Sequence, residues 1–439
     1  MAMFDTDEVK EKAILVGIDR GQTDWPVEES LAELENLAVT AGAEVVATVS
    51  QRISSPNPRT FIGAGKADEI AALALELDAD IVIFDDELTP SQQSNLERVL
   101  RSVKVIDRTA LILDIFALHA TTREGRLQVR LAQNEYLYPR LRGMWAHLAS
   151  NRMGGGVGSR FGEGESQLEV DRRIVRKRIS SIRRELKDLA RTRDIQRKSR
   201  TNSLVFRIAL AGYTNAGKSS LLNRLTDSAV LAYDKLFATL DATTRKLTFP
   251  DGRTVTLTDT VGFIQKLPTN LVEAFRSTLD EISEADLILQ VTDASASQRD
   301  AQMHAVHEVI ELIGAESIPT IIVFNKCDLI EPEEREALAR RYPSAVLVSA
   351  LTGAGIDELL ERMQAASIAD GDLLEVLLPY TRGDLVQLAH EHCSIISEEF
   401  LPEGTRLQLR APKALAGRFL EFRSDDRPGP AVDAGSSAG

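Results

Sequence analysis

Residues 212–219 read Gly-Tyr-Thr-Asn-Ala-Gly-Lys-Ser, a glycine-rich turn followed by an amine and a hydroxyl group. In such a turn the backbone N–H groups wrap phosphate oxygens at the start of a helix. Lys218 would reach the β- and γ-phosphates of a nucleotide, and the Ser219 hydroxyl would bind Mg²⁺. We therefore predict a P-loop formed by Gly212, Tyr213, Thr214, Asn215, Ala216, Gly217, Lys218 and Ser219.

A second motif, Asp-Thr-Val-Gly at 259–262, follows the alternating, strand-like run 254–258. At the end of that strand the Asp259 carboxylate can hold a water molecule bound to Mg²⁺. The Gly262 N–H can approach the γ-phosphate closely because glycine has no side chain to obstruct it. Thr260 and Val261 belong to the same turn, and we predict that they also contact the nucleotide.

A third motif, Asn325-Lys326-Cys327-Asp328, follows a strand-like run over 320–324. A carboxylate here can accept hydrogen bonds from N1–H and N2–H₂ of guanine, a pair of donors that adenine lacks. Each charge-assisted bond contributes about 1.5–3 kcal/mol. After a further strand-like run at 345–348, a backbone N–H could reach guanine O6 from Ser349, Ala350 and Leu351. The three motifs together predict GTP and GDP, rather than ATP, as ligands.

The bulk composition excludes several classes of protein. The 439 residues are 43% hydrophobic and 27% charged, as in an ordinary soluble protein. The two cysteines, Cys327 and Cys393, argue against a disulfide framework and suit a reducing cytosol. The N-terminus lacks the pattern of a signal peptide, and no apolar run reaches the roughly 18 residues of a membrane span. We expect a cytoplasmic monomer.

The elements that would position these loops alternate between strands and helices. Residues 1–116 predict strands over 12–17, 44–49, 80–84 and 103–106, with helices over 27–41, 67–77 and 91–100. This alternation predicts a parallel sheet, and hence an N-terminal α/β domain. The segment 61–66, Phe-Ile-Gly-Ala-Gly-Lys, lacks the first glycine and the Ser/Thr of a P-loop. An ATP-driven activity of this domain is therefore disfavoured.

The second half of the chain continues the α/β pattern. Residues 203–367 hold the three nucleotide motifs and predict a G domain. Strands over 373–379 and 405–410, with a helix over 385–392, predict a small α/β C-terminal domain at 368–423. Residues 424–439, rich in Pro, Gly, Ser and Ala, predict a disordered tail.

Residues 117–202 follow a different pattern, in which mostly apolar side chains recur at alternating spacings of 4 and 3 residues. This repeat is typical of a coiled-coil seam. The glycine-rich segment 154–164 separates two such runs and cannot continue either helix. The pattern predicts an antiparallel helical hairpin whose second arm is about 50 Å long. The two seams are Leu127, Leu131, Asn134, Tyr138 and Leu141, and Leu168, Val175, Ile179, Ile182, Leu186 and Leu189.

The second arm of the hairpin is strongly basic, although the net charge of the chain is −14. Residues 172–200 contain 13 basic and 3 acidic side chains, so ion pairs within the helix cannot balance the charge. A phosphate backbone would release counterions on binding here, and arginine can bind phosphate through two hydrogen bonds. We predict structured RNA as the partner, ahead of a solvated arm or an anionic membrane. The expected contacts are Arg172, Arg173, Arg176, Lys177, Arg183 and Arg184.

At this point the chain resembles the HflX family of ribosome-associated GTPases along essentially its whole length. The first arm matches at 124–129, 131–133 and 138–141, and the glycine-rich turn at 154–158, 164–169 and 171–173. The GTPase motifs match at 212–219, 237–241 and 259–263.

The resemblance implies a GTP hydrolase that binds the large (50S) ribosomal subunit and its RNA and helps to split stalled or stress-arrested ribosomes. It assigns Thr239 as the switch I ligand of Mg²⁺. Lys218, Thr239 and Gly262 are then the catalytic candidates. The switch I segment comprises Phe237, Ala238, Thr239, Leu240 and Asp241, which we expect to lie at the nucleotide.

Two alternatives stay open. Phe263 stands where Ras-like enzymes place a water-orienting glutamine, so we expect slow intrinsic turnover, completed by backbone, a cation or a partner. Asn215 could bind K⁺, as a resemblance to potassium-activated GTPases suggests, or it could only stabilise the turn. The hairpin could dock a protein complex instead of RNA, which would make the chain a GTP-gated adaptor.

Overall fold

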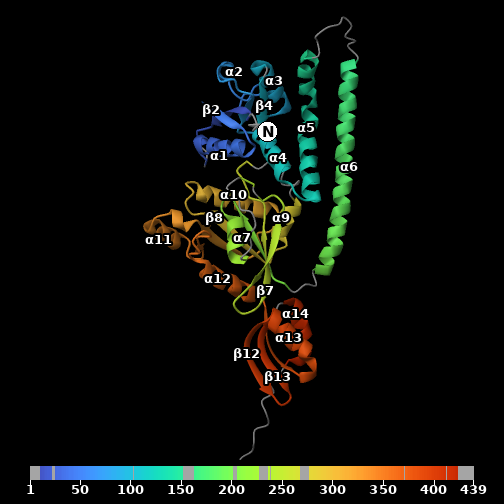
Figure 1. The fold of residues 1–439 in the computed structure, drawn as a ribbon, viewed down its shortest axis with the longest axis vertical. Helices are drawn as coiled ribbons and strands as arrows, with labels where there is room; N and C mark the ends of the chain where they lie inside the picture. The colour runs from blue at the N-terminus through green and yellow to red at the C-terminus, as the bar shows by residue number, and fades with distance from the viewer. Residues whose placement is uncertain are drawn as a thin grey trace, which may run out of the picture.

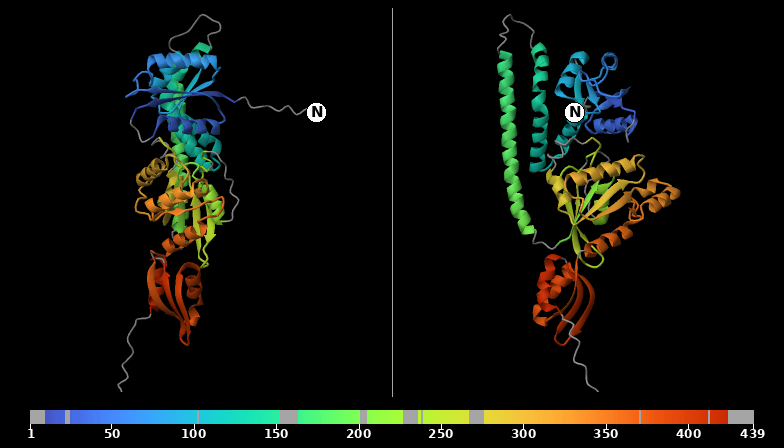
Figure 2. Two further views of the ribbon diagram at one scale, coloured as in Figure 1. Left: turned by 90° about the vertical axis from the view of Figure 1, so that its left-hand side faces the viewer. Right: turned by 180° about the vertical axis from the view of Figure 1, so that it is seen from behind.

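The computed structural model describes residues 10–21, 25–101, 103–151, 163–200, 205–226, 236–237, 239–266, 276–369, 371–411 and 413–423. An N-terminal α/β domain, a G domain and a small C-terminal domain follow one another along the long axis, and a helical hairpin runs beside the first two (Figures 1 and 2). The predicted fold class is confirmed. The expected tail at 424–439 and residues 154–162 of the expected glycine-rich loop lie outside the described residues.

The N-terminal domain is built on a parallel sheet with the strand order β2-β1-β3-β4. Its apolar strand residues are buried between helices on both faces, as expected for strands joined by helical crossovers. The elements are β1 (Lys12–Asp19), α1 (Val27–Thr40), β2 (Glu44–Arg52), α2 (Ala64–Glu76), β3 (Ile81–Phe84), α3 (Pro90–Leu100) and β4 (Lys104–Asp107).

Helix α4 (Arg108–His119) was not predicted from the sequence. The Asp107 carboxylate caps it by accepting a hydrogen bond from the Ala110 N–H at 2.9 Å. The apolar residues of α4 are buried on nearly every side, from Leu111 to Phe116. A helix buried all round has no amphipathic period to reveal it. It also crosses the expected domain boundary between residues 116 and 117.

The hairpin consists of α5 (Arg123–Asn151) and the antiparallel α6 (Glu163–Arg200), so the first turn of α6 includes the end of the expected glycine loop. Seam residues Leu127 and Val175 are buried as the heptad pattern predicts. Helix α5 has a second buried face that a single seam does not predict. There Val129 is buried, the Tyr136 hydroxyl donates to Asp107 at 2.9 Å, and Arg140 donates to the Leu88 carbonyl at 2.7 Å.

The G domain has a six-stranded sheet with the order β10-β9-β8-β5-β7-β6, parallel except for β6, which is antiparallel to β7. The nucleotide motifs follow the ends of β5, β7 and β9, so they lie along the same edge of the sheet. The strands are β5 (Arg207–Gly212), β6 (Thr243–Thr248), β7 (Thr254–Asp259), β8 (Leu287–Asp293), β9 (Thr320–Asn325) and β10 (Val346–Leu347). The helices are α7 (Lys218–Thr226), α9 (Arg276–Ser283), α10 (Arg299–Leu312), α11 (Pro332–Arg341) and α12 (Ile356–Ala369).

The C-terminal domain is an antiparallel sheet, β11-β13-β12, with two helices. Its strands are β11 (Asp372–Leu378), β12 (Ser394–Leu401) and β13 (Gly404–Ala411), and its helices are α13 (Gly383–His392) and α14 (Lys413–Phe419). The sequence analysis missed β12 and α14. Strand β12 is a partly exposed edge strand, so its residues lack the alternation of a half-buried strand.

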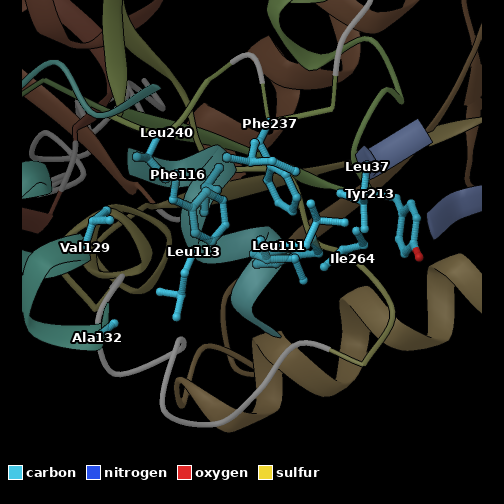
Figure 3. Close-up of a cluster of buried hydrophobic side chains, with 14 of the residues drawn as sticks. Leu37, Leu111, Leu113, Phe116, Val129, Ala132, Tyr213, Phe237, Leu240 and Ile264 are labelled. Atoms are coloured by element: carbon cyan, nitrogen blue, oxygen red, sulfur yellow. The ribbon is translucent and has the colours of Figure 1, made fainter. Parts of the chain in front are cut away.

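One apolar core joins the N-terminal domain to the G domain (Figure 3). Phe116 of α4 meets Phe237 of switch I edge-on, with ring centroids 4.6 Å apart. In the same cluster Leu111 of α4 lies close to Ile264, which follows the second nucleotide motif. Because this core is continuous, the loops of the nucleotide site are packed directly against the N-terminal domain.

Candidate functional site

The P-loop joins β5 to α7 with the geometry that a phosphate loop requires. Gly217 has a φ of +85°, and a Cβ there would lie 2.3 Å from Nδ2 of Asn325, so only glycine fits. Lys218 is buried, and its ammonium donates to the carbonyls of Gly212 at 3.1 Å and Tyr213 at 2.9 Å. Burial lowers the pKa of Lys218 to about 8, although Asp259 acts in the opposite direction. A nucleotide phosphate would supply the missing negative charge.

Three oxygen-bearing side chains converge beside Lys218. Oδ2 of Asp259 accepts hydrogen bonds from the Ser219 hydroxyl at 2.6 Å and the Thr239 hydroxyl at 2.9 Å. The two hydroxyl oxygens are 2.9 Å apart. The other oxygen of Asp259 is buried with no hydrogen-bond partner in the described part of the chain, and burial raises the pKa of this carboxyl. Hard oxygen donors in this arrangement fit Mg²⁺.

The second motif packs against the P-loop. The Phe263 N–H donates to the Gly212 carbonyl at 3.0 Å, and the Phe263 carbonyl accepts from the Thr214 N–H at 2.7 Å. A Cβ on Gly262 would lie 3.0 Å from the Lys218 ammonium. The Phe263 ring is buried in the apolar core, so it cannot orient a water molecule. The Thr260 hydroxyl donates to the Leu210 carbonyl, and the Val261 side chain is buried, which gives both structural roles.

The third motif holds the base-recognition loop and the P-loop together. The Asn325 side chain donates to the Ala216 carbonyl at 2.9 Å and accepts from the Ala350 N–H at 3.0 Å. The Ala350 N–H, one of the amides expected to face guanine O6, is therefore engaged by Asn325. Oδ1 of Asp328 is buried and has no hydrogen-bond partner among the described residues, as suits an acceptor reserved for guanine.

The residues beside Asn325, Asp328 and Ala350 differ in their contacts and burial. Lys326 adopts a left-handed φ of 60° and pairs with Asp293 at 2.7 Å. Cys327 is buried, and burial raises the pKa of its thiol. Ser349 is fully buried, whereas the Leu351 side chain is 82% exposed.

Other predicted nucleotide residues divide into two groups. Asn215 is exposed and has a left-handed φ of 59°, and the buried Thr214 hydroxyl has no partner in the described residues. Phe237 and Leu240 instead pack in the apolar core shared with the N-terminal domain, and Asp241 accepts hydrogen bonds from Thr121 and Thr122 at the start of the hairpin. Ala238 lies outside the described residues.

A buried polar network beside the site was missed by the sequence analysis. Arg108 donates to Glu33 at 2.7 Å and to Asp85 at 2.6 Å, and its guanidinium also bonds the Ser30 and Gln265 carbonyls. The Tyr213 hydroxyl of the P-loop donates to Glu33 and accepts from the Gln265 N–H at 2.7 Å. Apart from Tyr213, its members belong to no contiguous motif and come from separate parts of the sequence, so no pattern signals the network.

The predicted RNA-binding residues lie on two sides of α6. Arg172 and Arg176 lie over the Tyr138 ring of α5, and Arg183 pairs with Glu135 at 2.7 Å. Arg173, Lys177 and Arg184 are exposed. Their spacing places them on one stripe of the helix, which continues through the exposed Lys187 and Arg191. We call residues 173, 177, 184, 187 and 191 the basic stripe.

Three family models match the chain. They are described as GTP-binding GTPase N-terminal (residues 28–117), GTP-binding GTPase Middle Region (119–200) and 50S ribosome-binding GTPase (207–326). GTPase HflX from Lacrimispora saccharolytica is 44% identical over 415 residues, 94% of this chain and 96% of that protein. The chain belongs to the HflX family of GTPases.

A second relative supports this assignment to the HflX family. GTPase HflX from Escherichia coli is 42% identical over 413 residues, 93% of this chain and 96% of that protein. A solved GTP-binding protein from Sulfolobus solfataricus in complex with GDP is 22% identical, with a TM-score of 0.43, and covers 81% of this chain and 98% of that one. As an HflX-family protein the chain is a GTP hydrolase, as predicted. Within the described ranges, every helix is too short or too polar to cross a bilayer.

Proposed function

We propose that this HflX-family chain binds the large ribosomal subunit in a GTP-dependent manner and splits stalled or stress-arrested ribosomes, and that GTP hydrolysis releases it. The observation that carries the RNA contact is the basic stripe of α6. Its five side chains are exposed, whereas Arg176 and Arg183 bond to side chains of α5. A row of exposed cations about 27 Å long, at 1.5 Å per residue, matches a phosphate backbone in charge and length.

The site supports hydrolysis by positioning and electrostatics. When bound at this site, Mg²⁺ would supply positive charge to offset the negative charge that develops on the phosphate. We propose Ser219 and Thr239 as its direct protein ligands and Asp259 as a ligand through water. Lys218 and the Gly262 N–H would stabilise the γ-phosphate. Because Phe263 is buried, the attacking water must be oriented by backbone groups, by a partner, or by a K⁺ ion near Asn215.

Charge reversal within the basic stripe tests the ribosome contact. The triple variant Arg173→Glu, Lys177→Glu, Arg184→Glu should lose co-sedimentation with 50S subunits while nucleotide affinity stays unchanged. A matched control reverses three exposed cations elsewhere, Lys246→Glu, Arg340→Glu and Arg418→Glu. If the two triple variants bind 50S subunits equally well, the basic stripe is not the RNA contact.

The second candidate is a GTP-gated adaptor that docks a protein complex through the hairpin. Salt distinguishes the two, since each phosphate contact contributes roughly 0.7–0.9 to the slope of log affinity against log salt. RNA is supported if log affinity depends steeply on log salt and the magnitude of this slope is smaller by about two to three in the triple variant of the basic stripe. A shallow slope, unchanged in the variant, supports a protein interface.

Three further expectations accompany this proposal. We propose a cytoplasmic monomer, with domain limits at 116/117, 202/203 and 367/368. Turnover in K⁺ and Na⁺ buffers tests the cation, and equal rates would reject it. Addition of 50S subunits tests completion of the site, because a partner that orients the water should raise turnover strongly.

A further inference from the structure

Asp241 of switch I is bound by the first residues of the helical hairpin. Its Oδ2 accepts hydrogen bonds from the Thr121 N–H at 2.8 Å, the Thr121 hydroxyl at 2.6 Å and the Thr122 N–H at 2.8 Å. Its Oδ1 accepts from the Thr122 hydroxyl at 2.6 Å. Partial burial raises the pKa of Asp241, but these four bonds outweigh it and hold the pKa below its usual value. The carboxylate is therefore fully engaged by residues 120 positions away in the sequence.

This contact lies at the N-terminus of α5. Thr122 immediately precedes the helix, and its hydroxyl accepts from the Gly125 N–H at 2.9 Å. The peptide dipoles of a helix favour a negative charge at this end. The fit is tight, because a Cβ on Gly125 would lie 2.5 Å from Oδ1 of Asp241. Asp241, a residue of the G domain, therefore adds to the N-terminal cap of α5.

The contact lies close to the catalytic centre. Two residues of extended chain span at most about 7 Å, and Thr239, two residues before Asp241, bonds both Ser219 and Asp259. On the other side of Thr239, Phe237 packs against Phe116 of α4. The segment that carries the proposed Mg²⁺ ligand is therefore attached to the N-terminal helices on both sides.

We propose that Asp241 is a positioning residue for GTP hydrolysis: by binding the N-terminus of α5, it holds Thr239 at the metal site and couples turnover to the position of the hairpin. This goes beyond ribosome binding, because it requires only the GTPase activity of the chain. The coupling is reciprocal, so a hairpin displaced by any partner changes the placement of Thr239.

Two single variants break the contact from opposite sides. Gly125→Ala places a methyl group against Asp241 without changing any residue of the G domain, and Asp241→Ala removes the carboxylate. In each, kcat at saturating GTP should fall about fivefold or more, the lower end of typical coupling. The KM for GTP should change less than twofold, and the Mg²⁺ concentration for half-maximal rate should rise. Asp241→Asn should restore much of the rate, since asparagine caps helices about as well as aspartate.

The controls separate positioning from folding and from a direct role in the G domain. Gly65→Ala, a helical glycine with open space around its Cβ, should have the wild-type rate. The double variant Gly125→Ala, Asp241→Ala should be no slower than the slower single variant, because both remove one contact. Thermal melting with GDP checks that each variant is folded.

Several results would overturn the proposal. These are a normal rate in Gly125→Ala when Asp241→Ala is slow, additive losses in the double variant, or a raised kcat in either single variant. Hydrogen exchange over residues 119–126 tests the coupling in the reverse direction, from the nucleotide to the start of the hairpin. Exchange should be slower with Mg²⁺ and a non-hydrolysable GTP analogue than with GDP, and equal exchange in both states would also overturn the proposal.

Discussion

Arg108→Met tests whether the buried polar network holds the N-terminal domain against the nucleotide site. Arg108 is 2% exposed and Asp85 is 1% exposed, so both charges are out of water. Removing one partner of a buried ion pair typically costs 3–5 kcal/mol because the other charge stays buried. Lys266 still pairs with Asp85 and partly compensates, so we expect a loss of about 3 kcal/mol.

Trp25 provides a local assay for this variant. Its ring stacks on Tyr213 with centroids 6.2 Å apart, and the chain has two tryptophans. In a Trp145→Phe background, fluorescence therefore reports Trp25 at the interface during thermal unfolding. A loss of about 3 kcal/mol corresponds to a midpoint lowered by roughly 6–12 °C, at 2–4 °C per kcal/mol.

The matched control is Arg98→Met, the same change at an exposed arginine of α3, which should shift the midpoint by less than about 2 °C. pH gives a second check. Burial raises the pKa of Asp85, but the opposite effect of Arg108 and Lys266 is larger, so the pKa lies below its usual value of 3.8. The stability it contributes is present above pH 3.8 and is lost as the pH falls through its folded value. The difference in unfolding midpoint between Arg108→Met and the wild type should therefore become smaller as the pH is lowered. A midpoint for Arg108→Met equal to that of Arg98→Met at neutral pH would refute the reasoning.

Three further predictions concern the nucleotide site. Because the pKa of Lys218 is about 8, GDP binding at pH 8 should take up about half a proton as phosphate restores the ammonium, measured by calorimetry in two buffers. No uptake would contradict this, and Lys218→Arg should abolish it, since arginine stays protonated. Asp328→Asn should weaken GTP at least tenfold and favour XTP, whose C2 carbonyl accepts from an amide; competition binding measures both. Tyr213→Phe leaves the Gln265 N–H without its acceptor and should cost about 1–2 kcal/mol in the Trp25 assay.

The nucleotide loops were predictable from the sequence because each function depends on residues adjacent in the chain. A phosphate loop needs glycine at particular backbone angles, and Gly217 at a φ of +85° meets that need. The prediction of guanine rests on one carboxylate, Asp328, three residues after the end of β9. Chemistry of this kind depends on a few adjacent residues, so the sequence alone predicts the order and the type of these loops.

The contacts between domains were not predictable, for a physical reason. Asp241 and Thr121 meet only because α4 and the G domain share one apolar core, and neither residue belongs to a local pattern that requires the other. Helix α4 escaped detection because it is buried on nearly every side. The basic arm shows the same limit in another form. Composition revealed its charge, but only the structure shows that Arg176 and Arg183 bond to Tyr138 and Glu135 of α5.

The N-terminal domain and the start of the hairpin contact three loops that a nucleotide would order. Tyr213 of the P-loop bonds Glu33, Asp241 of switch I bonds Thr122, and Lys266 after the second motif pairs with Asp85. A change in the γ-phosphate region must therefore alter contacts with the N-terminal domain, the hairpin or both. Linkage requires the converse as well. A partner that moves the hairpin or the N-terminal domain must alter the nucleotide site, even if it never contacts the G domain.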